Sequence, residues 1–278
     1  MSVKFNHVTY QYNKKQSPAI FDVNVEFFHG ETIFIMGHTG SGKSTLIEHI
    51  NGLIYTKFGN IQIDFGEEKY RVYKRQKNIK LIRKNIGMVF QFPEKQLFES
   101  SVLKDVMFGP INFGFSEIEA EKQAINSLIV VGLKDEYHKR LPYTLSSGEK
   151  RKVAIAGVLA SKPNILIFDE PTASLDKKSV REFFEIVNRL KEKGVMIIIV
   201  SHNVDLAYEY ADKILLLSQG KAKYYGDYKN AFTNEEILEE AGIDKPFVCR
   251  VKERLNIQIN ARNIKELAPF IKGGAKDE

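Results

Sequence analysis

A glycine-rich segment near the N-terminus constrains the fold of this chain more than any other feature. Residues 37–44 read GHTGSGKS and follow the apolar run Ile33-Phe34-Ile35-Met36, which has the length of a buried strand. Glycines let the backbone curl so that its N–H groups converge on phosphate oxygens, and a following helix adds its positive N-terminal end. An ordinary glycine-rich turn does not need both flanking elements. The segment therefore predicts a nucleoside triphosphate site in an α/β fold.

The residues of this loop have separate expected tasks. Lys43 can reach the β- and γ-phosphates, and the Ser44 hydroxyl can ligate Mg²⁺. A helix should run from about Lys43 to Asn51, with Gly52 as its stop. The expected ATP-binding residues of the loop are Gly37, His38, Thr39, Gly40, Ser41, Gly42, Lys43, Ser44 and Thr45.

Two adjacent carboxylates form the second chemical feature. Residues 164–170 read NILIFDE, an apolar strand that ends in Asp169 and Glu170. Ligands of α/β sheets bind at the carboxyl ends of the strands. Asp169 would hold Mg²⁺ directly or through water, and Glu170 would act as general base on the attacking water. Two solvated acids or a helix N-cap would also explain the pair. At this point kinase-like transferases and hydrolases both remain open.

Residues 145–149 read LSSGE and precede a helix expected over 150–160. They resemble the signature segment of the ABC (ATP-binding cassette) ATPases, a Leu-Ser-Gly-Gly-Gln type sequence at a helix start, and this resemblance decides between the two classes. Ser146 and the backbone of Gly148 can contact a γ-phosphate at the start of this helix. Ser146 with Glu149 also fits a capping box, in which each residue bonds the backbone N–H of the other. The two interpretations are compatible.

These motifs together resemble the ABC (ATP-binding cassette) ATPases over roughly the first 225 residues. The resemblance implies an α/β P-loop nucleotide-binding domain with a mostly parallel core sheet, an antiparallel β subdomain and a helical subdomain. It implies that Gln91 is the glutamine that touches Mg²⁺ or water, that His202 contacts the γ-phosphate and that Tyr12 stacks on adenine. Asp176 ends the segment PTASLD, which looks like the family's D-loop. The expected catalytic residues are Glu170, His202 and Gln91, and the expected Mg²⁺ ligands are Ser44, Gln91 and Asp169.

The signature segment departs from the family pattern at two positions. Ser147 stands where the family usually has Gly, and Glu149 stands where it usually has Gln. The resemblance implies that each signature serves the phosphate loop of a second subunit. A β-carbon at Ser147 can crowd that loop, and a carboxylate near phosphate is unfavourable unless it points away. The site that uses Lys43 and Glu170 looks intact, so the asymmetry hints at a heterodimer.

The remaining pattern predicts the organisation of the chain. Alternating apolar residues in the first thirty positions indicate antiparallel strands, and strands at 164–168, 195–200 and 213–218 between helices indicate a parallel sheet. We expect a short hairpin at 220–226 and breaks at Pro110 and Pro142. Residues 1–229 form the expected nucleotide-binding domain, with its helical subdomain at about 91–160. Residues 230–278 form a helical appendage in which Phe247, Val251 and Leu255 make one apolar stripe.

Several segments resemble one branch of the family, the ATPases of energy-coupling factor (ECF) transporters. They are QFPEKQLF at 91–98, FGP at 108–110, NFG at 112–114 and AIAGVLA at 154–160, and the last resembles the second ATPase of the heterodimeric type. The resemblance implies import of vitamins or transition-metal ions. It also implies a second ABC ATPase held partly by the appendage, a transmembrane coupling subunit beside 91–98, and small substrate-binding membrane proteins.

Composition limits the other possibilities. No apolar run approaches the ~18 residues that span a bilayer. If the chain acts at a membrane, we therefore expect it to bind membrane-protein partners at the cytoplasmic face. The net charge of +6 owes much to eight Lys or Arg residues at 69–84, which we interpret as a solvated face and not a nucleic-acid site. Cys249 is the one cysteine, without residues that would activate it.

Three other functions share some of these features. An importer fed by a soluble binding protein would carry the same catalytic motifs and differ at 91–114 and in the tail. A non-transport ABC protein usually has a second cassette, a coiled-coil insertion or zinc ligands, and this chain has one cassette and one cysteine. A regulatory module that binds ATP without hydrolysis is opposed by Glu170 and His202, while the altered signature at Ser147 and Glu149 leaves this function open for one of the two sites.

Overall fold

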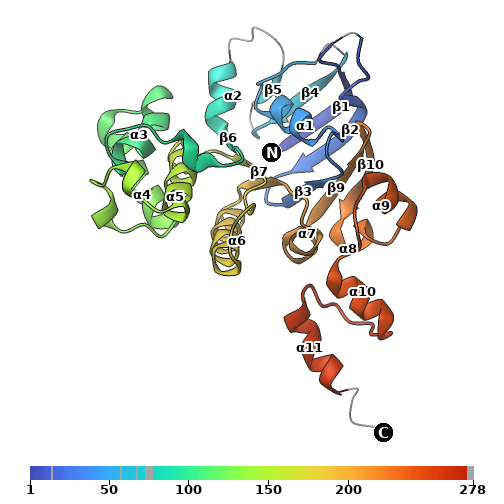
Figure 1. Cartoon of the computed structure of the whole chain (residues 1–278). Helices are drawn as coiled ribbons and strands as arrows, with labels where there is room; N and C mark the ends of the chain where they lie inside the picture. The colour runs from blue at the N-terminus through green and yellow to red at the C-terminus, as the bar shows by residue number, and fades with distance from the viewer. Residues whose placement is uncertain (14, 57, 67, 73–77, 274–278) are drawn as a thin grey trace.

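The core of the molecule is a six-stranded sheet, seen in the computed structural model (Figure 1). The structure describes residues 1–13, 15–56, 58–66, 68–72 and 78–273. Its parallel strands are β9 (Lys213–Ser218), β3 (Thr32–Met36), β8 (Met196–Val200), β7 (Ile165–Asp169) and β6 (Ile86–Val89), in that spatial order, and β10 (Lys221–Asp227) adds an antiparallel edge. Every residue of β3 and β8 is buried, as expected for central strands covered on both faces.

A second, antiparallel sheet has the order β2-β1-β4-β5. Its strands are β1 (Ser2–Tyr10), β2 (Ile20–Phe28), β4 (Phe58–Asp64) and β5 (Lys69–Arg71). Phe5 lies opposite Val25 on one side and Ile61 on the other. The helix α1 (Lys43–Ile50) shares a hydrophobic core with strands of both sheets through Leu46, Ile47 and Ile50. The helix that follows the glycine-rich loop is thus fixed between two sheets.

A group of helices, called here the helical arm, lies beyond the β6 edge (Figure 1). It contains α3 (Val102–Asn112), α4 (Glu117–Val130) and α5 (Ser147–Leu159), and the short α2 (Ile79–Asn85) precedes β6. The hydroxyls of Ser101 and Ser116 cap α3 and α4. Gly87 lets the arm approach the sheet, because a Cβ there would stand 2.4 Å from a methyl carbon of Val158.

The remaining helices cover the sheet and extend the molecule toward its C-terminus. They are α6 (Lys177–Glu192), α7 (Val204–Tyr210), α8 (Tyr228–Ala231), α9 (Glu235–Ala241), α10 (Phe247–Arg254) and α11 (Ile264–Gly273). Figure 1 places α10 and α11 at the far end of the molecule from α2 and β5. No helix among the described residues has the length and hydropathy to cross a bilayer.

The structure corrects three details of the sequence interpretation. Residues 220–226 are not a hairpin by themselves: Gly220 lies in the turn before β10, and residues 221–226 belong to β10, which pairs with β9. Pro110 lies inside α3 instead of ending it. The apolar stripe on α10 does not mark the buried face of this helix, since Val248 is its buried residue while Phe247 and Leu255 are about half exposed. Part of the basic stretch, 73–77, lies outside the described residues.

Candidate functional site

The site is assembled by the order of the parallel strands. Strands β3, β8, β7 and β6 are neighbours and point in the same direction. The glycine-rich loop follows β3, His202 follows β8, Asp169 and Glu170 end β7, and Gln91 follows β6. Since the carboxyl ends of parallel strands meet at one edge, four segments far apart in the sequence converge there.

The glycines of the loop are required by its conformation. Gly37, Gly40 and Gly42 have φ values of 148°, 81° and 103°, a region that other residues rarely adopt. A Cβ at Gly37 would stand 2.1 Å from the Leu217 oxygen, and one at Gly42 would stand 2.4 Å from the Ala19 oxygen. Gly40 has open space in the direction of a Cβ. The loop is therefore packed against the protein on one side and open on the other.

Lys43 lies across this loop. Its Nζ donates hydrogen bonds to the carbonyl oxygens of Gly37, at 2.7 Å, and His38, at 2.9 Å. Burial lowers the pKa of Lys43, while the charges of Glu170 and Asp169 act in the opposite direction. A phosphate placed in the loop can replace the two carbonyl oxygens as acceptor of the Lys43 hydrogen bonds, and its negative charge complements the charge of the lysine.

The loop is supported from behind by later parts of the chain. The Gly220 N–H donates to the Ser41 oxygen at 3.0 Å, which ties the loop to the β9–β10 turn. The His38 N–H donates to the Ala241 oxygen at the end of α9, at 2.7 Å. These contacts leave the open side of the loop free.

The two carboxylates at the end of β7 are held in a low-dielectric setting. Burial raises the pKa of Asp169, and burial followed by the charge of Asp169 raises the pKa of Glu170. Glu170 adopts φ 48°, and its N–H donates to the Val200 oxygen at 3.0 Å. A left-handed conformation in a residue with a side chain costs free energy. The neighbouring strand β8 therefore holds Glu170 in a strained orientation.

His202 lies beside that carboxylate. Its Nε2 lies 3.4 Å from Glu170 Oε1, a contact without hydrogen-bond geometry, so that this buried oxygen has no hydrogen-bond donor among the described residues. Burial lowers the pKa of His202, and the charge of Lys43 adds to the effect. A neutral imidazole faces a carboxylate with an unused lone pair, which can accept a proton from water.

Tyr12 lies beside the same helix start. Its hydroxyl is 3.1 Å from Thr45 Oγ1 and 3.4 Å from a carboxylate oxygen of Glu48. Its ring packs edge-on against Tyr10 with 5.0 Å between centroids, and 59% of the residue is exposed. The exposed aromatic ring offers a surface on which a nucleobase can stack.

The signature segment lies apart from this edge, in the helical arm. Strands β8 and β7 separate β6, against which the arm lies, from β3 and its loop. The capping box is confirmed: Glu149 accepts hydrogen bonds of 2.8 Å from the Ser146 N–H, the Ser146 hydroxyl and the Tyr137 hydroxyl. The N–H of Ser146 is the main cause that lowers the pKa of Glu149, and Tyr137 comes next. The carboxylate therefore points back into its own helix start.

Asp176 has a comparable local role. It is the N-cap of α6, and its carboxylate accepts the Ser179 N–H at 2.7 Å. The sequence motifs did not identify Tyr137 as a partner of the signature segment. They also did not identify Arg151, which lies buried at the junction of several motifs; a basic residue inside a helix gives no sequence signal for such contacts.

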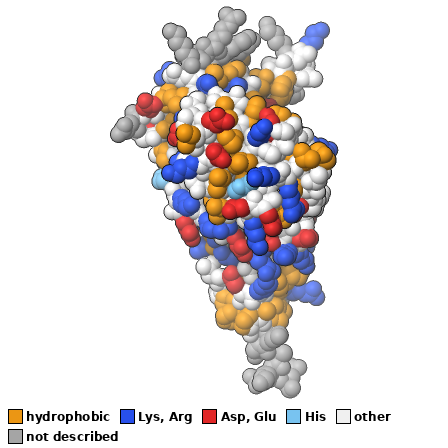
Figure 2. Space-filling view, turned by 90° about the vertical axis from the view of Figure 1, so that its left-hand side faces the viewer, with side chains coloured by type: hydrophobic (Ala, Val, Ile, Leu, Met, Phe, Trp, Pro, Cys, Tyr) orange, Lys and Arg blue, Asp and Glu red, His pale blue; other side chains and the backbone are white. Residues whose placement is uncertain are grey.

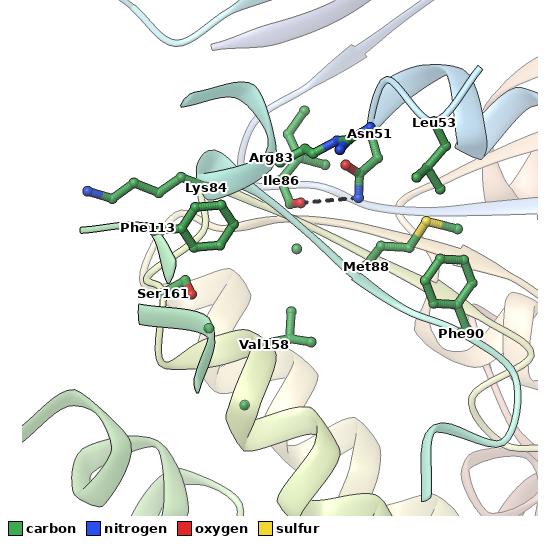
Figure 3. Close-up of a pocket in the computed structure, with 13 residues that line it drawn as sticks. Asn51, Leu53, Arg83, Lys84, Ile86, Met88, Phe90, Phe113, Val158 and Ser161 are labelled. Carbon is green, nitrogen blue, oxygen red and sulfur yellow. Dashed lines mark hydrogen bonds between the residues drawn. The ribbon is translucent and has the colours of Figure 1, made fainter. Parts of the chain in front are cut away.

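An apolar hollow of about 300 Å³ lies between the sheet and the helical arm (Figure 3). Met88, Phe90, Phe113 and Val158 point toward it. Arg83 and Lys84 lie at its edge, where the Arg83 guanidinium donates to the Gly52 oxygen at 2.9 Å and the Lys84 amine points away from the hollow. Three glycines, at 87, 109 and 157, add no side chain to it. Figure 2 shows the arm side of the molecule, where hydrophobic side chains are mixed with both basic and acidic ones. A hollow of this kind, apolar with a basic rim, can receive a segment of another protein.

Comparisons with known proteins agree with this geometry. The family model described as ABC transporter matches residues 20–173. The energy-coupling factor transporter ATP-binding protein EcfA2 of a Bacillus cereus strain is 43% identical over 92% of this chain and 88% of its own. The protein with the same description from Bacillus licheniformis is 40% identical over 100% and 99%.

Solved structures show the same fold. The structure of cbiO1 from Clostridium perfringens, described as part of the ABC transporter complex cbiONQ, has a TM-score of 0.75 and 33% identity, and covers 92% of this chain and 98% of its own. The ATP-binding cassette MJ0796, in a dimeric post-hydrolysis state bound to ADP and Pi, has a TM-score of 0.70 and 29% identity, with coverage of 81% and 98%.

Proposed function

The chain belongs to the ABC transporter family and, within it, to the energy-coupling factor transporter ATP-binding proteins; from this premise we propose that it energises an importer of vitamins or transition-metal ions from the cytoplasmic face of the membrane. As a member of this family it binds ATP and is an ATPase. The observation that carries the proposal is the convergence of the loop 37–42, Asp169, Glu170, His202 and Gln91 on one sheet edge.

The residues present fit ATP with Mg²⁺. The open side of Gly40 and the buried, unpaired Ser41 hydroxyl of the described loop leave room and a donor for phosphate. Ser44, Asp169 and Gln91 supply oxygen atoms of the kind that Mg²⁺ prefers. When bound, Mg²⁺ would neutralise charge on the β- and γ-phosphate oxygens.

The protein side of the proposed mechanism follows from the contacts described above. Tyr12 stacks on the base, and Lys43 exchanges its two carbonyl acceptors for phosphate oxygens. Glu170 accepts the proton of the attacking water, which its raised pKa favours. His202 stays neutral and donates toward the γ-phosphate, so that no charge opposes the proton transfer. The remaining loop residues Gly37, His38, Thr39, Gly42 and Thr45 position the phosphates.

A second ABC ATPase completes the proposed site. We assign Ser146 and Gly148 to the site of the partner, because the signature lies in the arm and not beside the loop of its own chain. Asp176, the N-cap of α6, remains a proposed nucleotide contact. The Cβ of Ser147 makes that site differ from the one built on Lys43, while the carboxylate of Glu149 is turned back to the Ser146 N–H and hydroxyl of its own helix start. This difference favours a heterodimer, which the appendage 230–278 would help to hold together beside the domain 1–229.

The proposed transmembrane coupling subunit docks on the arm side. The hollow lined by Met88, Phe90 and Phe113 is continuous in sequence with the segment 91–98, and its apolar walls and basic rim suit a helix of that subunit. Movement of the arm would then transmit the closing and opening of the two ATPases to the membrane subunit. Small substrate-binding membrane proteins would complete the importer and determine its substrate.

A tagged pull-down from detergent-solubilised membranes tests this proposal. Recovery of a second ABC ATPase, one larger membrane protein and several small ones is the expected result. A conventional permease pair instead would replace the ECF assignment with an importer of the binding-protein-dependent type. Recovery of only nucleic-acid-associated partners would refute the transport proposal.

A further inference from the structure

Arg151 occupies an unusual position for a charged residue. It lies in the first turns of α5, just after the signature segment, and only 8% of it is exposed. A buried guanidinium is costly unless acceptors surround it. Arg151 has three: its NH1 donates to the oxygens of Pro171 and Ala173, each at 3.1 Å, and its Nε donates to Glu94 Oε2 at 3.4 Å.

The three acceptors belong to two different functional segments. Pro171 and Ala173 form the turn directly after Glu170, and the Ala173 N–H bonds back to the Glu170 oxygen at 3.2 Å. Glu94 lies in the 3₁₀ turn Pro93–Gln96, three residues after Gln91. One side chain on the signature helix thus joins the segment 91–98 to the loop that carries Glu170.

The geometry of Glu170 makes this connection significant. Its left-handed backbone is strained and must be imposed by its surroundings. The Glu170 N–H is fixed by Val200 on one side, and the turn at 171–173 is fixed by Arg151 on the other. If Glu94 moves away, Arg151 loses its only described carboxylate and can swing from the two carbonyls, which releases the turn.

We propose that Arg151 and Glu94 are positioning residues that make hydrolysis depend on the position of the segment 91–98. The inference rests on the proposed function, because it assumes that the membrane subunit docks on that segment. When the segment is in place, the Glu94–Arg151 pair holds the turn after Glu170 and keeps the carboxylate aimed at water. Neither residue touches ATP, so they act on the rate constant of hydrolysis and not on nucleotide affinity.

The test uses the complete complex, with the general-base carboxylate of the partner ATPase replaced so that only the Glu170 site turns over. Arg151→Lys keeps the charge but cannot reach all three acceptors, and Glu94→Gln removes the ion pair while keeping the shape. We expect kcat to fall roughly 10-fold in each, as for a misaligned catalytic group, with KM for ATP within about twofold. The double variant should be no slower than Arg151→Lys alone, because the two residues act as one unit.

Lys152→Gln is the matched control. Lys152 is the next residue of the same helix and pairs with Glu182 at 2.8 Å on its partly exposed side. We expect its kcat to equal that of the unmutated complex. An equal loss in this control, unchanged kcat in both Arg151→Lys and Glu94→Gln, or additive losses in the double variant would each overturn the inference. If the complex in which only the partner's general base is replaced does not hydrolyse ATP, this result would instead refute the proposed function.

Discussion

Acid should destabilise this protein through one buried histidine. His49 lies on α1, the helix that begins at Lys43, and is fully buried. Its Nδ1 lies 2.7 Å from the Thr45 carbonyl oxygen, which can only accept, so Nδ1 carries the hydrogen and Nε2 is bare. Nε2 is buried without a partner among the described residues. Protonation would place an uncompensated charge in the core.

The magnitude follows from the pKa. Burial lowers the pKa of His49 from 6.5 to about 4. A lowered pKa in the folded state means that the stabilisation is present above pH 6.5 and is lost as the pH falls toward 4. Proton linkage between those two values gives a loss of about 2 kcal/mol at pH 5 relative to pH 7.5. The α1 helix, and with it ATP binding, should weaken over the same range.

Urea unfolding at pH 7.5 and pH 5 measures this term. His49→Phe keeps an aromatic ring against Tyr10, whose ring centroid lies 4.8 Å from that of His49, and removes the titrating group. The pH-dependent loss of unfolding free energy should shrink by about 2 kcal/mol in this variant. Tyr10→Phe is the control, because it alters the same contact and retains the histidine. Equal losses in unmutated protein and His49→Phe would refute the reasoning.

Three further predictions concern the site. Glu170→Gln should slow turnover roughly 10²–10⁴-fold while ATP binding is retained, measured with the partner site disabled; unchanged turnover would refute the assignment. Because burial raises the pKa of Glu170, kcat should fall on the acid side at a higher pH than an ordinary glutamate would give, and a pH–rate profile without that limb would contradict this. Gly40→Ala should cost ~1 kcal/mol of unfolding free energy through its positive φ. Gly42→Ala should cost more in the same urea titration, because its Cβ would also meet the Ala19 oxygen at 2.4 Å.

The sequence predicted the parts of the site that follow from strand ends. Hydrophobic runs located β3, β7, β8 and β9 to within a residue or two, and the order of parallel strands then brings Glu170 and His202 to the loop. Pro110 was harder to predict: it removes one helical hydrogen bond, but α3 ends at Asn112, so only two residues of the helix follow the proline. The apolar stripe on α10 did not identify the buried face of the helix, because tertiary contacts, not spacing alone, decide which face is buried.

Contacts between distant side chains could not be predicted in the same way. Nothing in the sequence separates Arg151 from its neighbour Lys152, although one is buried and the other pairs with Glu182 at the surface. The cap formed by Glu149 was predicted from its spacing to Ser146, while the additional hydroxyl of Tyr137 depends on how the arm folds. Local spacing predicts local bonds, and packing determines the others.

The support of the phosphate loop by α9 limits how this protein can be recombined with its relatives. The Ala241 oxygen holds the His38 N–H, the Glu240 oxygen accepts the Ser218 hydroxyl at 2.6 Å, and a Cβ at Gly242 would stand 3.1 Å from that of His38. A chimera with its junction at 229 would combine the phosphate loop of one parent with the supporting helix α9 of another. A junction after Ile243 keeps the loop and α9 from the same parent, so the C-terminal segment is better exchanged at that point.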